Sequence, residues 1–495
     1  MSSITSIFRY KPLDPVQPDA IRVLEIVPGD DAATVECSLY TTTLSDLSGN
    51  YRAVSYAWGD VTERCIIKVN GFSLSITPNL NSVLRSFRAG EQQGKFWIDA
   101  ICINQLDLDE RSQQVQQMKE IYTEAREVWV WLGSGHPSRP LEASFLMSLA
   151  VRARQIGLLT PNLATMFSFP LCDFEPLIQE FTGESFHSQW RAVADLFAQP
   201  WWGRTWVIQE LSSAKRATLY YGDVPIDLSA IILIIQMLRT CHTRLLEVDS
   251  INDLLRDKAD AISGARELIF MWHIVNYSTR ATLHSLLRLS RKTSCQDPRD
   301  KVFAVLGIAP AEVRMLYKPN YKESTIWVYG MAIMMYIHCH ANLDILLNVD
   351  DGTSNAGLPS WIVDWNRKHQ AQYFDYSGLS FRAGHHTTPV VAVPDGMRIL
   401  NVEGFHIDII SETGVQGIEL QGAERTNVSH YNLIALFKPI FWKTWRAATW
   451  LCQMGTMQRR SEVESLNIGS GSGFSHFSFL VSNTLTQYCT LLAAL

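Results

Sequence analysis

The segment 51–133 constrains the fold of this chain more than any other. Within it, three short apolar runs, at 52–57, 96–101 and 128–132, are separated by segments with helical periodicity. Alternation of strand-length apolar runs with helices is typical of an α/β domain built on a parallel sheet. Each run is followed by polar or glycine residues, and such domains bind ligands at the carboxyl ends of their strands. We therefore expect functional side chains at these strand ends.

Local turn signals add further elements to this domain. Asn70-Gly71 lies between two short apolar runs and is a strong signal for a two-residue β-hairpin turn. Thr77 followed by Pro78 then predicts the start of a helix that extends to about residue 88.

Two acidic segments carry helix-capping signals. Asp107 is expected to cap a helix that continues to residue 125, and Glu110, three residues later, is the expected reciprocal capping partner. The segment from Asp297 through Pro298 to Asp300 has the same character, so it also predicts a helix start. For both segments the structural role is the favoured interpretation.

Composition limits the class of protein. The 495 residues are 47% apolar and 19% charged, with a net charge of -6, which is typical of a globular protein without affinity for nucleic acid. No apolar stretch is long enough to span a membrane. Nine cysteines without a C-x-x-C pair, and a start without a signal-peptide core, favour a cytoplasmic location. No histidines or cysteines have metal-ligand spacing, so no metal site is expected.

Changes in periodicity divide the chain. We predict an N-terminal extension over 1–50, the α/β domain over 51–222 with an insertion at about 134–199, a mainly helical region with short strands over 223–435, and an irregular tail over 436–495. The tail contains a flexible Gly-Ser run and has weak periodicity.

Three sequence words follow one another in this domain: YRAVSYAWGD, WIDAICINQ followed by DER, and QMKEIYTEAREVWVWLG. In their order and spacing they resemble the heterokaryon incompatibility (HET) domain of filamentous fungi. Further blocks, PWWGRTWVIQEL, DPRDKVFAVLGIA and LPSWIVDWN, are similar to others found in that family. The resemblance implies an effector of non-self recognition and programmed cell death, acting with a protein partner or by self-association. A non-catalytic signalling module and an accessory protein of unassigned role are the open alternatives.

The HET domain also resembles the TIR domain, a flavodoxin-like parallel sheet with flanking helices. Some TIR domains hydrolyse NAD with a glutamate that follows a tryptophan on a late helix, and the matching word here is WVIQEL. This resemblance makes Glu210 the candidate catalytic residue and NAD a candidate substrate. It also matches Ser55 to the word that ends the first strand of a TIR domain.

The residue types around Glu210 suit cleavage of an N-glycosidic bond. A carboxylate stabilises the oxocarbenium-like transition state of that reaction. Trp206 offers an indole for stacking and Arg204 a guanidinium for the pyrophosphate. The competing interpretation is that Glu210 caps or pairs on a helix that Trp202 and Trp206 anchor in the core.

Two further residues are candidates for contact with a ligand. Asp99 comes late in an apolar run, where a buried carboxylate is costly without a partner. Its alternative role is to fix the next loop through a hydrogen bond to Arg111 or to the backbone near Asn104. Trp58 follows the first strand at the same edge, where it either stacks on a base or covers the core.

Overall fold

The computed structural model describes residues 6–30, 32–89, 94–134, 141–160, 171–222, 224–240, 257–277, 281–349, 357–367, 389–393 and 396–402. The chain divides into two compact units, one of residues 1–370 with 391–401 and the other of residues 371–390 with 402–495. Nearly all the described residues belong to the first unit. The predicted irregular tail, 436–495, lies outside them.

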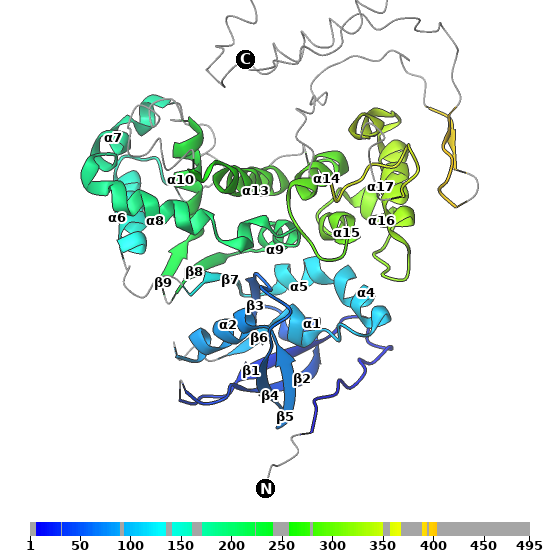
Figure 1. Cartoon of the computed structure of the whole chain (residues 1–495), viewed down its shortest axis with the longest axis horizontal. Helices are drawn as coiled ribbons and strands as arrows, with labels where there is room; N and C mark the ends of the chain where they lie inside the picture. Colours follow the sequence, from blue (N-terminus) through cyan, green and yellow to red (C-terminus); the bar gives the residue numbers. More distant parts are fainter. Residues whose placement is uncertain are drawn as a thin grey trace, which may run out of the picture. The chain divides into compact units, whose positions relative to one another are not determined.

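A nine-stranded sheet forms the centre of this unit (Figure 1). Its strands lie in the order β5-β4-β2-β1-β6-β3-β7-β8-β9. Their bounds are β1 (Ala20–Ile26), β2 (Glu36–Thr43), β3 (Arg52–Tyr56), β4 (Cys65–Val69), β5 (Phe72–Ile76), β6 (Lys95–Trp97), β7 (Glu127–Gly133), β8 (Ala217–Tyr221) and β9 (Val224–Asp227).

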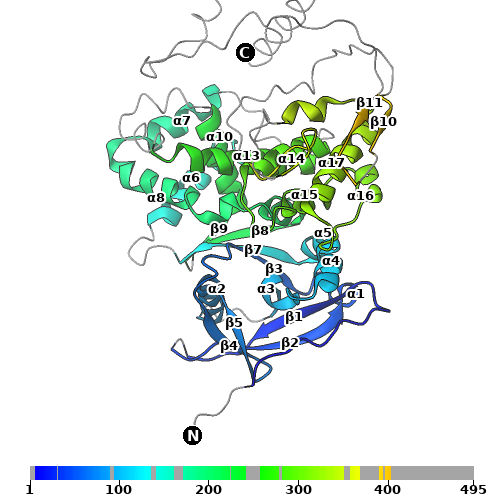
Figure 2. The ribbon, with the colours of Figure 1, turned by 45° about the vertical axis from the view of Figure 1, so that its right-hand side comes forward.

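The sheet is mixed, which corrects the prediction of a parallel sheet. Strands β6, β3, β7 and β8 pair in parallel, and nearly all side chains of β3 and β7 are buried, as expected for central strands covered on both faces. At the flanks, β1 pairs antiparallel with β2 and β6, and β9 pairs antiparallel with β8 (Figure 2). Strands β1 and β2 come from the predicted N-terminal extension, so that segment is part of the sheet.

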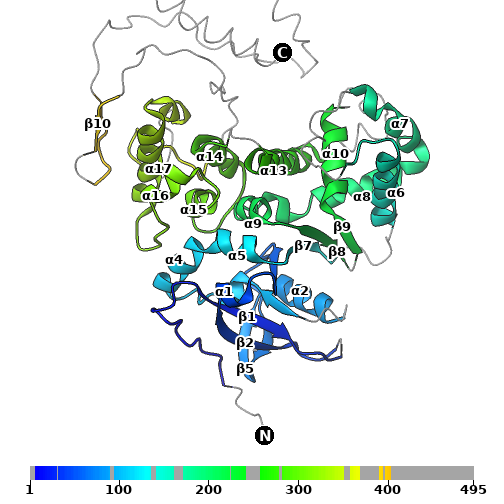
Figure 3. The ribbon, with the colours of Figure 1, turned by 180° about the vertical axis from the view of Figure 1, so that it is seen from behind.

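Helices pack against the sheet and against one another in the described part of the chain. They are α1 (Leu44–Leu47), α2 (Pro78–Ala89), α3 (Asp99–Cys102), α4 (Leu108–Gln116), α5 (Met118–Glu124), α6 (Leu141–Gln155), α7 (Leu171–Phe181), α8 (His187–Phe197), α9 (Val207–Ser213), α10 (Leu228–Thr240), α13 (Ala259–Tyr277), α14 (Leu283–Lys292), α15 (Asp300–Leu306), α16 (Ala311–Leu316) and α17 (Thr325–His340). Helix α5 packs against α9, and α13 packs between α10 and α14 (Figures 1 and 3). The prediction of a mainly helical downstream region is therefore confirmed. Strands β10 (Val391–Ala392) and β11 (Asn401–Val402) form a separate two-stranded pair.

The local turn signals are confirmed. Asn70 and Gly71 have φ angles of 51° and 83°, so both central residues of the β4–β5 turn are left-handed, as a type I′ hairpin requires. Helix α2 begins at Pro78, and the Thr77 hydroxyl accepts a hydrogen bond from the Leu80 backbone N–H.

Two element boundaries differ from the predictions. The predicted strand 96–101 ends at Trp97, and Asp99 opens helix α3, where its carbonyl accepts a bond from Ile103. The predicted helix 107–125 is two helices, because the Gln117 N–H bonds to both Gln114 and Val115 and tightens the turn between α4 and α5.

The capping prediction is right for Asp107 and wrong for Glu110. The Asp107 carboxylate accepts hydrogen bonds from the backbone N–H groups of Asp109 and Glu110. The Glu110 carboxylate instead binds Arg22 of β1 at 2.6 and 2.8 Å and accepts a bond from the Asn104 N–H. Both side chains of this ion pair are buried, so it joins α4 to the sheet.

None of the helices in the described part of the chain combines the length and apolar character that a bilayer crossing requires.

Candidate functional site

A pocket of about 1250 Å³ lies at the carboxyl end of β3. The loop after β3 contributes residues 57–59 to its wall, and α3 with the following loop contributes Asp99, Ile103 and Gln105. Helices α4 and α5 contribute Arg111, Val115 and Met118. The remaining wall comes from residues at 200–206, 294–300 and 321–325. The pocket therefore lies at the sheet edge that was predicted to carry functional side chains.

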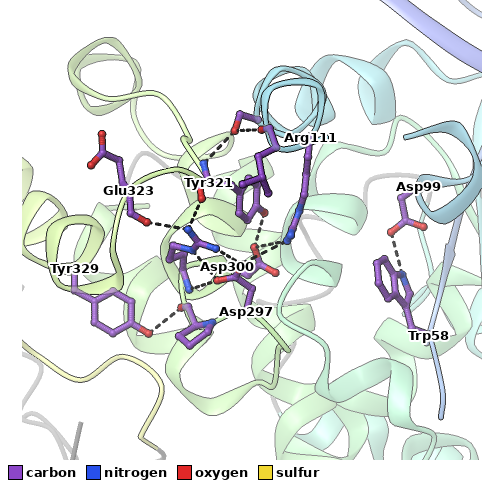
Figure 4. A network of polar contacts seen from close by, with 12 residues as sticks. Trp58, Asp99, Arg111, Asp297, Asp300, Tyr321, Glu323 and Tyr329 are labelled. Atoms are coloured by element: carbon purple, nitrogen blue, oxygen red, sulfur yellow. Dashed lines mark hydrogen bonds and ion pairs between the residues drawn. The ribbon is translucent and has the colours of Figure 1, made fainter. Parts of the chain in front are cut away.

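Asp99 and Trp58 form one polar pair on this wall. The Trp58 Nε1–H donates to Asp99 Oδ2 at 3.1 Å, and the Ala100 N–H donates to Oδ1 at 2.7 Å (Figure 4). Burial raises the pKa of Asp99, while the charge of Arg204 and the Trp58 hydrogen bond oppose the rise. In its alternative role, Asp99 was predicted to bind Arg111 or the backbone near Asn104. Among the described residues its carboxylate bonds instead to Trp58 and Ala100, and Gln105 Nε2 donates to the Asp99 carbonyl at 3.0 Å.

Arg204 connects this pair to the buried carboxylate. It lies just before α9, lines the pocket and donates a hydrogen bond to the Tyr56 carbonyl at the end of β3. Its Nη1 atom is 3.7 Å from Glu210 Oε1, and 16% of its side chain is exposed. Because Arg204 faces both Asp99 and Glu210, their charges raise its pKa although burial opposes this.

Glu210 lies on α9 and is 1% exposed. The Ser55 hydroxyl donates to its Oε2 atom, and the Trp201 Nε1–H donates to the Ser55 hydroxyl at 2.7 Å. Its Oε1 atom is buried and has no hydrogen-bond partner among the described residues. Burial raises the pKa of Glu210 to about 7, with Arg204 and Ser55 opposing the rise and the charge of Asp99 adding to it.

The structure brings all six predicted site residues together but places them in two layers. Trp58, Asp99, Arg204 and Trp206 line the pocket. Among the residues that the structure describes, Ser55 and Glu210 are not part of the lining, but Glu210 contacts the pocket-lining Arg204 at 3.7 Å. The candidate carboxylate is therefore next to the pocket without being open to it.

Residues that the sequence assigned to helix capping line the same pocket. Helix α15 begins at Asp300, and its N-cap is Arg299 rather than Asp297. The Asp297 carboxylate accepts bonds from the Arg299 backbone and guanidinium, while Asp300 accepts one from the Tyr321 hydroxyl (Figure 4). Local sequence could not separate the two roles, because the same residue types at the same spacing serve as caps. No sequence pattern indicated that Tyr321 would line a pocket.

Among the described residues, no three histidine, cysteine, aspartate or glutamate side chains lie close enough together to hold a metal ion.

Comparison with known proteins gives two findings. The sequence model of the heterokaryon incompatibility protein (HET) family matches residues 51–210. Heterokaryon incompatibility protein 6, OR allele, of Neurospora crassa is 26% identical over an alignment of 454 residues. That alignment covers 80% of this chain and 65% of the relative, so the chain spans less than two thirds of the relative's length.

No solved structure matches the chain, so the TIR-like assignment stays a prediction. Three observations agree with one another: the order and spacing of the sequence words, the family match over 51–210, and the similarity to the Neurospora protein. The chain contains a HET domain and is a distant homologue of heterokaryon incompatibility protein 6 of Neurospora crassa.

Proposed function

We propose that this protein is a cytoplasmic effector of fungal non-self recognition and programmed cell death, acting through its HET domain. The relative's printed name and the family match support the biological role. The alignment extends well beyond 51–210, which supports a shared role for the downstream region as well. A protein partner or self-association of the HET domain would supply the trigger.

The pocket, in this proposal, binds NAD, and Glu210 promotes its hydrolysis. The observation that carries the proposal is the buried Glu210 Oε1 atom, which has no hydrogen bond among the described residues and faces the pocket-lining Arg204. A buried carboxylate oxygen without a hydrogen bond is costly, and such costs concentrate at functional sites. The pocket volume of about 1250 Å³ is ample for a dinucleotide.

The chemistry requires one carboxylate. The bond between C1′ of the ribose and the nicotinamide nitrogen breaks, and nicotinamide leaves as a neutral molecule with the bonding electron pair. Glu210 stabilises the positive charge that develops on the ribose. A water oxygen then bonds to C1′ and releases a proton, giving ADP-ribose.

Arg204 controls access to Glu210 in this scheme. The guanidinium is 3.7 Å from Glu210 Oε1, which is too long for a strong hydrogen bond. A pyrophosphate entering the pocket competes for the same guanidinium, because planar N–H pairs bind phosphate oxygens well. Movement of Arg204 onto the pyrophosphate then opens Glu210 to the ribose.

The second candidate function is a non-catalytic signalling module. The 1% exposure of Glu210 and its contact with Ser55 favour it, because a buried side chain fixed in this way also serves packing. In that case the pocket is a binding site or a structural cavity, and Glu210 stabilises the junction of α9 with β3.

Release of nicotinamide from NAD separates the two functions. The full chain, Glu210→Gln and Glu120→Gln are incubated with NAD, and both compounds are followed by chromatography. Glu120 is an exposed carboxylate on α5 outside the pocket lining, so it is the matched control. We expect nicotinamide from wild type and Glu120→Gln, and a loss of at least about 100-fold in Glu210→Gln.

The outcomes that contradict the proposal are distinct. No nicotinamide from micromolar wild type over hours would refute hydrolysis and leave the signalling module. Equal rates for wild type and Glu210→Gln would refute the role of Glu210. Expression in a fungal host completes the test, because growth arrest by wild type that Glu210→Gln relieves links the chemistry to cell death.

A further inference from the structure

The pocket has a second wall that lies outside the HET family match. That match ends at residue 210, whereas segments 294–300 and 321–325 also line the pocket. The downstream region therefore completes the site, and its side chains are placed to determine which ligand fits.

Helix α4 holds this second wall in place. The Tyr321 N–H donates to the Ser112 hydroxyl at 3.0 Å, and Gln116 Nε2 donates to the Pro319 carbonyl at 2.9 Å. The Arg111 guanidinium lies 3.7 Å from the centroid of the Tyr321 ring, which is close cation–π contact. The segment around Tyr321 is thus bound to the HET domain through backbone, hydroxyl and ring contacts.

Asp297 is already neutralised within this wall. Arg299 binds it with two parallel bonds, Nε to Oδ1 at 2.9 Å and Nη2 to Oδ2 at 2.7 Å. The remaining nitrogen of Arg299 donates to the Glu323 carbonyl at 2.8 Å. Bidentate pairs of this kind are strong, so neither group is available to a ligand.

Asp300 is different because its charge is only partly compensated. The Tyr321 hydroxyl donates to Asp300 Oδ1 at 2.5 Å, whereas Arg111 Nη2 is 3.8 Å away, beyond hydrogen-bond distance (Figure 4). Arg111 is the one cation within 4 Å of Asp300 in the part of the chain that the structure describes, and it also faces Asp297. The Trp206 side chain is a further hydrogen-bond donor to Asp300. With 5% exposure, the carboxylate lines the pocket, and its remaining acceptor positions can take donors from a ligand there.

We infer that Asp300, held by Tyr321, accepts hydrogen bonds from a ribose of the bound dinucleotide and makes the site prefer a free 2′-hydroxyl to a 2′-phosphate. The inference rests on the proposed binding of NAD in this pocket. A carboxylate suits ribose hydroxyls because both groups of a vicinal diol donate to it. This side of the pocket carries three carboxylates and two guanidinium groups, those of Asp297, Asp300 and Glu323 and those of Arg299 and the facing Arg111. It therefore has no surplus positive charge for a phosphate dianion.

Calorimetric titration with ADP-ribose and its 2′-phosphate tests this inference without any turnover. Wild type is expected to bind ADP-ribose at least about tenfold more tightly than the 2′-phosphate. Asp300→Asn should weaken ADP-ribose binding about tenfold and remove most of that preference. Tyr321→Phe, which keeps the carboxylate and removes the tyrosine donor, should change both quantities in the same direction by a smaller factor.

The control is Asp109→Asn, an exposed α4 carboxylate that pairs with Lys322 outside the pocket lining. It should bind both ligands as wild type does. If Asp300→Asn and Tyr321→Phe are folded and keep the wild-type affinity for ADP-ribose and the wild-type preference over its 2′-phosphate, the inference is overturned. The proposed NAD binding would remain. Wild type that fails to bind ADP-ribose would overturn the proposed site together with the inference. Binding that depends on Asp300 without nicotinamide release would support the inference and refute only the hydrolysis.

Discussion

Replacing Glu210 with glutamine should change how stability depends on pH. Burial raises the pKa of Glu210 to about 7 from the ordinary 4.5, with Arg204 and Ser55 opposing the rise. That difference of 2.5 pH units, at about 1.4 kcal/mol per unit, corresponds to roughly 3 kcal/mol. Because Glu210 is 1% exposed, solvent screening reduces this figure little.

The sign follows from the direction of the pKa shift. The folded protein holds the Glu210 proton more tightly than the unfolded chain does. The stabilising contribution of the protonated group is complete below pH 4.5 and is lost as the pH rises through about 7. Relative to Glu210→Gln, wild type should therefore lose up to about 3 kcal/mol of unfolding free energy between pH 4.5 and pH 8. Ser55→Ala removes the donor that lowers the pKa of Glu210, so it should make that loss larger.

Urea unfolding followed by tryptophan fluorescence measures this difference. Wild type, Glu210→Gln and Ser55→Ala are compared at pH 5 and pH 8, and the transition of the sheet-containing unit is fitted in each. Other titrating groups are shared by the variants, so their effects largely cancel in the comparison. A stability difference that is the same at both pH values would refute the burial argument. A wild type that gains stability over the variant as the pH rises would show that Arg204 holds an ionised Glu210.

Two further changes test the fold. Glu110→Gln leaves the Arg22 guanidinium buried without its carboxylate, with 3% of the side chain exposed, and should cost about 3–5 kcal/mol by urea unfolding. The double variant Arg22→Met with Glu110→Leu should recover most of that loss, and a single-variant cost below about 1 kcal/mol would contradict the assignment. Gly71→Ala should cost about 1–2 kcal/mol because φ is +83°, although no atom lies within 4 Å of the added Cβ. Gly264→Ala, at an uncrowded site in α13, should instead stabilise by about 0.5–1 kcal/mol, and equal effects of the two changes would contradict the conformational argument.

Features encoded by adjacent residues could be predicted from the sequence. The Asn70-Gly71 turn depends only on residues that tolerate positive φ, and the start of α2 depends on Thr77 and Pro78. The central strand β7 was predictable from its continuous apolar run.

Features that depend on distant partners could not be predicted. Glu110 has the spacing of a capping partner, yet a buried arginine 88 positions earlier provides stronger compensation for its charge. Strand β1 pairs antiparallel with both β2 and β6, and an apolar run does not specify its neighbours. The sheet was therefore predicted as parallel throughout, although β1, β5 and β9 pair antiparallel with their neighbours.

The candidate site also has some features that the sequence could predict and others that it could not. The six predicted residues lie together because they occupy the end of β3, the start of α3 and the start of α9. The sequence could not show that Glu210 contacts the pocket-lining Arg204 without lining the pocket itself, because that depends on side-chain placement. It also could not assign Asp300 to the pocket, since capping explains the same residue equally well.

An experimental structure of the full-length E210Q variant with NAD tests the central claim most directly. We predict the dinucleotide in the pocket, with its pyrophosphate on Arg204 and its nicotinamide ribose beside position 210. Arg204 should have moved away from position 210, and a ribose hydroxyl should lie within hydrogen-bond distance of Asp300. An empty pocket at saturating NAD, or NAD bound elsewhere with Arg204 unmoved, would contradict the proposal.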